Sequence, residues 1–241
     1  MINPITEVQA FVRAALVDPV PRDHTEPDAA FRRRRVVVVV TLLVGAAVLT
    51  WALRIEPGDP TFYTATFALA AVWAIGAFAS GPLHLSRGHT RDGKDTSRAV
   101  VQSLALGALL LGLFMVGAVV VAQVPLLRDP VQELLDHARF GSLAVVAVIT
   151  MVNGIAEELY FRGAMYAAVG RRHAVAVTTV VYTLVTATSG IPLLILAGAL
   201  VGLVVGLQRR VTGGTLGPIV THLTWSLGML FLLPEVFDRL S

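Results

Sequence analysis

Three ionisable side chains lie close together inside one long apolar segment of the sequence. Residues 157–162 read Glu-Glu-Leu-Tyr-Phe-Arg. On a helix, residues four apart are neighbours on one face, so Glu158 and Arg162 can pair, whereas Glu157 points about a quarter-turn away. A buried carboxylate without a cationic partner is suited to accept or donate a proton. The spacing predicts that Glu157 is a general base, which Asn153, one turn earlier, could orient or supply with water.

A histidine occurs in a later apolar segment. Of the six histidines, only His222 falls inside a predicted span, and Ser226 follows it by one helical turn on the same face. Glu157 precedes the basic turn at 171–172 by about as many residues as Thr186 follows it. Antiparallel helices therefore place Glu157 and Thr186 at similar depth. We expect Glu157 to lie within reach of the His222 imidazole inside the bundle.

The composition indicates which kind of scaffold must position these groups. Hydrophobic residues make up 55% of the 241 residues and charged residues only 15%, and the mean hydropathy is +0.73. This balance is typical of an integral membrane protein. The chain has no cysteine, which excludes disulfides and thiolate metal ligands. No repeat or linker divides it, so we expect one domain.

The apolar runs predict an all-α, polytopic transmembrane bundle with about seven spans. A helix of roughly 20 residues crosses the hydrocarbon core of a bilayer. Runs of suitable composition occur at 36–53, 62–80, 99–122, 140–165, 174–189, 192–207 and 216–233. Two of them, 174–189 and 192–207, are short and are joined by a tight connection, so they could instead form a re-entrant pair.

The distribution of Lys and Arg predicts the orientation, because loops rich in these residues stay on the cytoplasmic side. Fourteen of them fall on one side of the predicted spans: Arg13, Arg22, Arg32 to Arg35, Arg87, Arg91, Lys94, Arg98, Arg171, Arg172, Arg209 and Arg210. The other side has only Arg54, Arg128, Arg139 and Arg239. We therefore expect a cytoplasmic N-terminus. These residues end apolar segments and form no basic stripe with aromatics, so nucleic acid is not expected as a partner despite the net charge of +3.

The sequence divides into three regions. Residues 1–35 form an expected cytoplasmic segment with a short amphipathic helix on the membrane, which Thr6 and Gln9 would cap by their spacing. Residues 36–135 hold the first transmembrane helices, and a second amphipathic helix is expected to begin at Asp129, with Pro130 in its first turn. Residues 136–241 contain all the candidate site residues.

The motif in residues 140–233 resembles the CPBP family of intramembrane metalloproteases. That family includes CAAX prenyl endopeptidases of the Rce1 type and bacteriocin-processing or bacteriocin-immunity proteins. The shared features are Glu-Glu-x-x-x-Arg in a membrane helix and, about 60 residues later, Pro-x-x-x-His at the start of another. The resemblance implies that Glu157 activates a water, that Glu158 and Arg162 support the site, and that His222 is a metal ligand or a catalytic histidine.

Two positions depart from the family pattern. The family usually has Phe-x-x-x-His before the last motif, whereas residues 182–186 read Tyr-Thr-Leu-Val-Thr, with Thr186 at the histidine position. Ser226 replaces the Asn or Asp that usually follows the last histidine. The resemblance implies zinc or another divalent metal on Glu157 and His222, but a hydrolytic zinc site usually has three protein ligands. Metal-independent hydrolysis, with hydroxyls of Thr186 and Ser226 binding a water or a carbonyl oxygen, is the alternative.

The leading hypothesis is an intramembrane endopeptidase that hydrolyses a peptide bond in a membrane-associated protein or peptide. The competing hypothesis is a non-catalytic protein of the same fold that binds a membrane partner, such as an immunity-type protein. A transporter is less favoured, because no inverted repeat relates the two halves of the chain. Lys94 is the only lysine, and this preference for arginine is typical of a GC-rich bacterial genome. We therefore expect the bacterial cytoplasmic membrane.

Overall fold

The computed structural model describes residues 3–21, 25–56, 59–90, 95–139, 142–170 and 172–240, without the side chains of 133, 134 and 136–139. Most of the described residues are helical. The elements, in order, are α1 (Pro4–Val12), η1 (Arg13–Val17), α2 (Asp28–Ala52), α3 (Thr61–Ser80), β1 (Gly88–His89), β2 (Thr96–Ser97), α4 (Val100–Ala122), α5 (Pro125–Arg139), α6 (Leu143–Glu157), η2 (Glu158–Met165), α7 (Tyr166–Val169), α8 (Ala174–Ala187), α9 (Pro192–Thr212) and α10 (Leu216–Leu240).

The all-α transmembrane architecture is confirmed, and the protein is an integral membrane protein. Among the described residues, six helical segments are long and apolar enough to cross a bilayer. One of them is the continuous run α6–η2–α7, which covers the 27 residues Leu143–Val169. The seventh expected span corresponds to α8, an apolar helix of only 14 residues. Its partner α9 has 21 residues and is longer than the sequence predicted.

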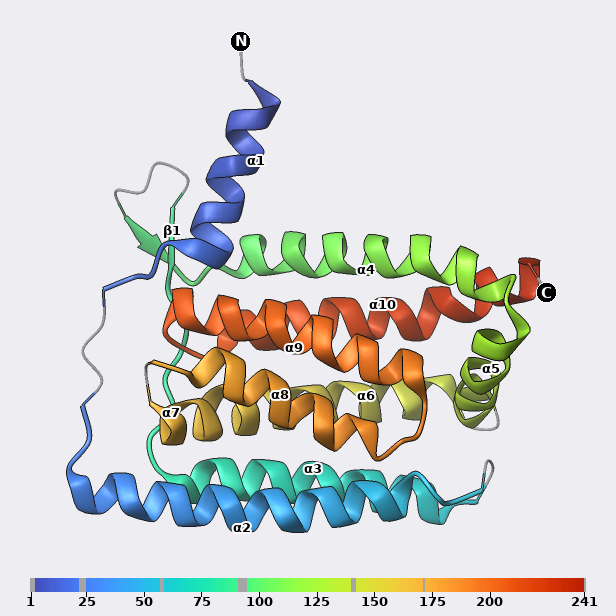
Figure 1. Cartoon of the computed structure of the whole chain (residues 1–241), viewed down its shortest axis with the longest axis horizontal. Coiled ribbons are helices and arrows are strands. Elements are labelled where there is room, and N and C mark those ends of the chain that lie inside the picture. Colours follow the sequence, from blue (N-terminus) through green and yellow to red (C-terminus); the bar gives the residue numbers. More distant parts are fainter. Residues whose placement is uncertain are drawn as a thin grey trace.

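The long helices lie side by side along one axis (Figure 1). The pair α2–α3 forms one side of the bundle, the pair α4–α10 forms the other, and α6, α8 and α9 fill the space between them. Small residues allow the close contacts, as is usual between membrane helices. A Cβ on Gly107 of α4 would lie 2.7 Å from the carbonyl oxygen of Thr221 in α10. A Cβ on Gly198 of α9 would lie 3.0 Å from the hydroxyl oxygen of Thr186 in α8.

One end of the bundle, which we call the basic end, carries most of the described Arg side chains. It is the left-hand end in Figure 1, where α2, α4, α8 and α10 begin and where α3, α7 and α9 finish. The Arg side chains there are Arg13, Arg32, Arg33, Arg34, Arg35, Arg87, Arg98, Arg172, Arg209 and Arg210. Arg22, Arg91, Lys94 and Arg171 lie outside the described residues. The sequence predicts that this end is cytoplasmic.

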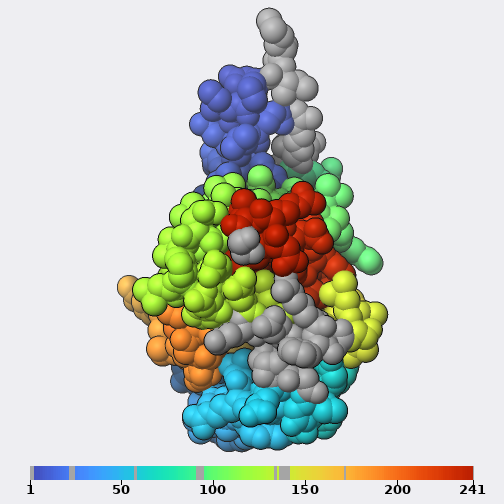
Figure 2. Space-filling view, turned by 90° about the vertical axis from the view of Figure 1, so that its right-hand side faces the viewer, coloured from blue at the N-terminus to red at the C-terminus, as the bar shows by residue number. Residues whose placement is uncertain are grey.

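The two amphipathic helices begin elsewhere than the sequence predicted. The prediction that Thr6 caps the first helix was wrong, because α1 begins at Pro4 and the side chain of Asn3 accepts a hydrogen bond from the amide of Ile5 at 3.0 Å. The second helix begins at Pro125, four residues before Asp129, so Pro130 lies inside it. In Figure 1, α1 runs across the direction of the spans, and Figure 2 shows it projecting beyond the bundle.

An aromatic cluster fixes the position of the glutamate segment. Trp73 of α3 packs against Tyr160 and Phe161 of η2, with ring centroids 4.6 and 5.3 Å apart. The hydroxyl of Tyr160 donates to the carbonyl of Val38 in α2 at 2.6 Å. All three rings are buried, so they anchor η2 between α2 and α3 and leave the opposite face of η2 to α8, α9 and α10.

Candidate active site

The segment that carries the ionisable residues departs from regular α-helical geometry. α6 ends at Glu157, and η2 continues as a π-helical turn, a feature that often marks functional sites. The amide of Tyr166 donates to the carbonyls of Phe161 and Gly163 and passes over that of Arg162. The carbonyl of Arg162 instead accepts a hydrogen bond from Arg209 Nε at 2.6 Å. The π-helical turn therefore ties the site to the last turn of α9.

Glu158 is the centre of a buried charge network. Its Oε1 lies 3.1 Å from Arg162 Nη1 and 2.8 Å from His222 Nδ1, and the side chains of Glu158 and Arg162 are fully buried. Because an ionised carboxylate only accepts hydrogen bonds, Nδ1 of His222 carries a proton in this arrangement. Arg162 Nη2 also donates to the carbonyl of Gly202 at 3.2 Å. The network links η2, α9 and α10.

Glu157 points to a different neighbour. The hydroxyl of Tyr182 in α8 donates to Glu157 Oε2 at 2.8 Å. The sequence did not predict this contact, although Tyr182 lies one helical turn before Thr186 and therefore on the same face of α8. The ring of Tyr182 also lies beneath the guanidinium of Arg162, 4.6 Å from its centre. Tyr182 thus contacts both sides of the site.

A cavity of about 210 Å³, lined by both polar and apolar side chains, lies beside Glu157. We call it the polar cavity because it holds most of the polar candidate residues. Its lining includes every candidate residue except Glu158 and Arg162. The lining residues are Thr150, Asn153, Gly154, Glu157, Tyr182, Thr186, Leu194, Ala197, Gly198, Val201, His222, Trp225 and Ser226. Since roughly 10–15 Å³ can hold one water molecule, the cavity is large enough for a water and part of a substrate.

Several polar atoms of the lining residues have no hydrogen-bond partner in the described part of the chain. They are Asn153 Oδ1, Trp225 Nε1 and Ser226 Oγ. Buried polar atoms are usually satisfied, so those around a cavity are candidates to bind a polar group that enters it. The amide nitrogen of Asn153 donates to the carbonyl of Ile149 at 3.1 Å, not to Glu157. The hydroxyl of Thr186 donates to the carbonyl of Tyr182 at 2.9 Å, which leaves its oxygen as an acceptor.

The donor set does not match a hydrolytic zinc site. Within the residues that the structure describes, no three His, Asp or Glu side chains are grouped to hold a metal ion. Glu157 and His222 line the cavity together with Thr186, and a threonine hydroxyl is not among the usual zinc ligands. Glu158 Oε1 already contacts Arg162 and His222. Because such a site usually has three protein ligands, the described residues do not fit a hydrolytic zinc ion.

Comparison with known proteins gives one match. Residues 139–228 match the model of a protein family described as Type II CAAX prenyl endopeptidase Rce1-like. The match confirms the resemblance predicted from the glutamate motif, and it covers both Glu157 and His222. This is a family of intramembrane proteases that are typically metal-dependent. Neither the curated proteins nor the solved structures that were compared give a match.

Proposed function

We propose that the protein is an intramembrane endopeptidase with Glu157 as its general base, because residues 139–228 match the Rce1-like CAAX prenyl endopeptidase model. The observation that supports this most is the placement of the Glu157 carboxylate at a polar cavity that His222 also lines. Glu158, by contrast, is committed to Arg162 and His222. The two neighbouring glutamates therefore have different roles, one reactive and one structural.

In the proposed reaction, Glu157 takes a proton from a water in the cavity as the water oxygen bonds to the carbonyl carbon of the substrate. The negative charge that develops on the carbonyl oxygen needs hydrogen-bond donors. Ser226 and Trp225 can supply them from the cavity wall, since neither Ser226 Oγ nor Trp225 Nε1 has a partner among the described residues. Glu157 then gives its proton to the leaving nitrogen as the carbon–nitrogen bond breaks.

The hydrogen bond from Tyr182 would orient Glu157 throughout this cycle. A donor at 2.8 Å stabilises the carboxylate form and fixes its rotamer, so that the second oxygen can face the water. His222, held by Glu158, would contribute positive charge or a donor from the cavity lining. Arg162 and Glu158 act through His222 and are positioning residues in this scheme.

A second cavity supports a membrane-associated substrate. It has a volume of about 350 Å³, lies between α4, α5, α9 and α10, and is lined by apolar side chains. Leu194, Ala197 and Trp225 line both this cavity and the polar one, so the two are neighbours. An apolar segment of a substrate could lie there while the adjacent peptide bond enters the polar cavity. We propose a membrane-associated peptide or protein as the substrate, and the bacterial cytoplasmic membrane as the location.

Profiling of peptide termini tests the proposal. Membranes from cells producing the wild-type protein or Glu157→Gln at equal levels would be compared by mass spectrometry for newly formed termini of membrane-associated proteins. We expect termini that depend on the wild-type carboxylate and vanish with the glutamine, which keeps the size and polarity of the side chain. Equal termini in both samples would exclude Glu157 as the base. Equal thermal stability of the two proteins in detergent is the control.

The short donor set and the bonded hydroxyl of Thr186 favour a second candidate, a non-catalytic protein of the same fold that binds a membrane partner. In that case purified wild-type protein would give no new termini and would contain no stoichiometric metal by elemental analysis. Metal at one equivalent, lost together with activity in His222→Ala, would instead support a metal-dependent peptidase.

A further inference from the structure

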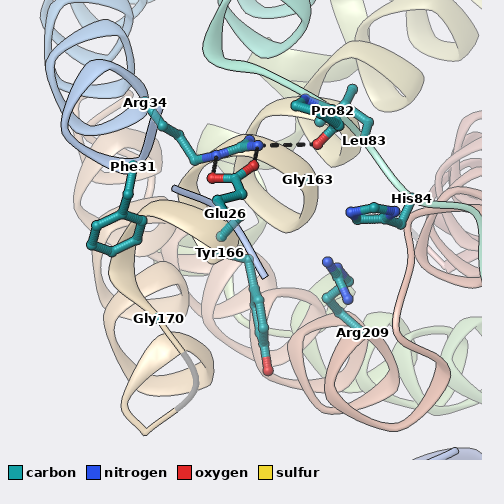
Figure 3. Close-up of a pocket in the computed structure, with 11 residues that line it drawn as sticks. Glu26, Phe31, Arg34, Pro82, Leu83, His84, Gly163, Tyr166, Gly170 and Arg209 are labelled. Carbon is teal, nitrogen blue, oxygen red and sulfur yellow. Dashed lines mark hydrogen bonds and ion pairs between the residues drawn. The ribbon is translucent and has the colours of Figure 1, made fainter. Parts of the chain in front are cut away.

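A third cavity opens at the basic end, away from the candidate active site. It has a volume of about 220 Å³, and its lining comes from the segment before α2, from α2 itself, from the loop after α3, from η2 and α7, and from α9. Its polar lining residues are Glu26, Arg34, His84, Tyr166 and Arg209. Figure 3 shows their side chains converging on one space, with the Glu26–Arg34 pair on one side and His84 and Arg209 on another.

The walls of this cavity are held in place by hydrogen bonds. Arg34 donates from Nε to Glu26 at 2.9 Å, from Nη1 to Ser80 at 3.1 Å and from Nη2 to the carbonyl of Pro82 at 3.2 Å. The loop after α3 is also bonded to the α9–α10 turn, because the amide of Thr215 donates to the carbonyl of His84 at 3.0 Å. The cavity is therefore a built site and not a gap between mobile side chains.

Two of the contacts of Arg209 fix its orientation. Its Nε donates to the carbonyl of Arg162 at 2.6 Å, and its guanidinium lies over the ring of Tyr166, 4.8 Å from the centre. These contacts fix the plane of the guanidinium while the side chain lines the cavity and is 5% exposed. A planar guanidinium held in this way is suited to bind the oxygens of a phosphate.

The described lining residues have a net positive charge. Arg34 and Arg209 contribute two positive charges and Glu26 one negative charge, which Arg34 pairs directly. Burial, followed by the charges of Arg209 and Arg34, lowers the pKa of His84 from its ordinary 6.5, while Glu26 has the opposite effect. The charges of Arg209 and Arg34 thus lower the pKa of His84 more than the charge of Glu26 raises it. This is expected for a cavity with a positive potential.

We propose that this cavity binds a phosphate group, carried by an anionic lipid headgroup or present as free phosphate, with Arg209 and His84 as the contacting side chains. The location supports a lipid source. Basic pockets between membrane helices on the cytoplasmic side are typical binding sites for anionic headgroups. The site is distinct from the polar cavity beside Glu157, and the bond from Arg209 to the carbonyl of Arg162 connects the two.

The test uses the full chain in nanodiscs of phosphatidylcholine with isotope-labelled histidine. Phosphatidylglycerol in the nanodisc and inorganic phosphate in the buffer are titrated separately, and the ring signal of His84 is followed by NMR. An anion beside the imidazole favours its charged form, so we expect the pKa of His84 to rise when the site is filled. The matched variants are Arg209→Gln and Arg210→Gln, which remove the same charge at adjacent positions, one lining the cavity and one outside it.

We expect Arg209→Gln to weaken binding roughly tenfold to a hundredfold, as for the loss of charge-assisted hydrogen bonds, and Arg210→Gln to change it less than about twofold. If the pKa of His84 rises with phosphatidylglycerol alone, the ligand is a membrane lipid. If it rises with inorganic phosphate alone, the ligand is soluble. If it rises with both, the site recognises the phosphate group itself. If Arg209→Gln does not fold, the wild-type His84 titration still decides. Absence of any His84 response to both ligands, or equal effects of the two variants, would overturn the proposal.

Discussion

Replacing Arg162 with alanine should destabilise the bundle strongly. The side chains of Arg162 and Glu158 are both fully buried, with Nη1 and Oε1 3.1 Å apart. Removal of the guanidinium leaves the carboxylate with His222 as its remaining partner and also removes the bond to the carbonyl of Gly202. Breaking a buried ion pair by removing one partner costs about 3–5 kcal/mol. We therefore expect the free energy of unfolding to fall by about that amount.

The measurement is equilibrium unfolding in mixed micelles of a mild detergent and dodecyl sulfate, followed by tryptophan fluorescence. The matched control is Arg128→Ala, which breaks an ion pair with Asp129 in which the two side chains are 30% and 59% exposed. Exposed pairs contribute about 0.2–1 kcal/mol, so this change should be small. The contrast between the two variants isolates the effect of burial.

A double variant tests the physical reason for the loss. Arg162→Met combined with Glu158→Leu replaces the buried pair by apolar side chains, and such replacements are often neutral or stabilising. It should be more stable than Arg162→Met alone, although it has two substitutions, because no unpaired carboxylate remains in the interior. Unchanged stability of Arg162→Ala, or a double variant less stable than the single one, would refute the buried charge network as the element that fixes η2.

Three further outcomes are expected. Tyr182→Phe removes the hydroxyl that bonds Glu157 and should lower the cleavage rate roughly tenfold or more. The control Thr183→Val, on the same helix, should leave the rate unchanged. Equal cleavage rates for the two variants would exclude the orienting role of Tyr182. Gly214→Ala should prevent folding of the α9–α10 turn, because its Cβ would lie 2.1 Å from the carbonyl carbon of Leu85. The control Gly112→Ala, whose Cβ would meet nothing within 4 Å, should be tolerated. Equal yields of folded protein for the two variants would contradict this packing. The hydrogen bond from Arg34 lowers the pKa of Glu26 below its ordinary 4.5. The ionised Glu26 therefore stabilises the fold above pH 4.5, and this stabilisation is lost as the pH falls through the lowered pKa. Melting curves should show this loss in the wild type and not in Glu26→Gln.

The membrane helices could be predicted from the sequence because apolar length alone determines them. Most spans were placed within a few residues, since the bilayer requires about 20 apolar residues per helix. The start of α2 was placed eight residues too late, at 36, because the run Arg32 to Arg35 lies inside the helix that begins at Asp28. The start of α5 was missed because Pro130, a usual first-turn residue, lies inside the helix. The π-helical turn that begins at Glu158 was also missed, and the carbonyl of Arg162 within it accepts a hydrogen bond from Arg209, which is 47 residues away in sequence.

The candidate site was predictable in part. Helical spacing was sufficient to predict the Glu158–Arg162 pair and to separate Glu157 from it. Spacing within one helix carries no information on contacts between helices. It therefore did not reveal that His222 bonds to Glu158 or that Tyr182 bonds to Glu157. Both contacts depend on how closely α8, α9 and α10 approach η2, which small residues such as Gly202 permit.

The most direct test of the account is the incorporation of oxygen from water into a cleaved peptide. Purified protein would be reconstituted in vesicles with a substrate identified by terminus profiling, in water labelled with ¹⁸O. We predict one labelled oxygen in each new carboxyl terminus with the wild-type protein and no product with Glu157→Gln, at equal folded fraction. Labelled product formed at the wild-type rate by Glu157→Gln would contradict the assignment of Glu157 as the base.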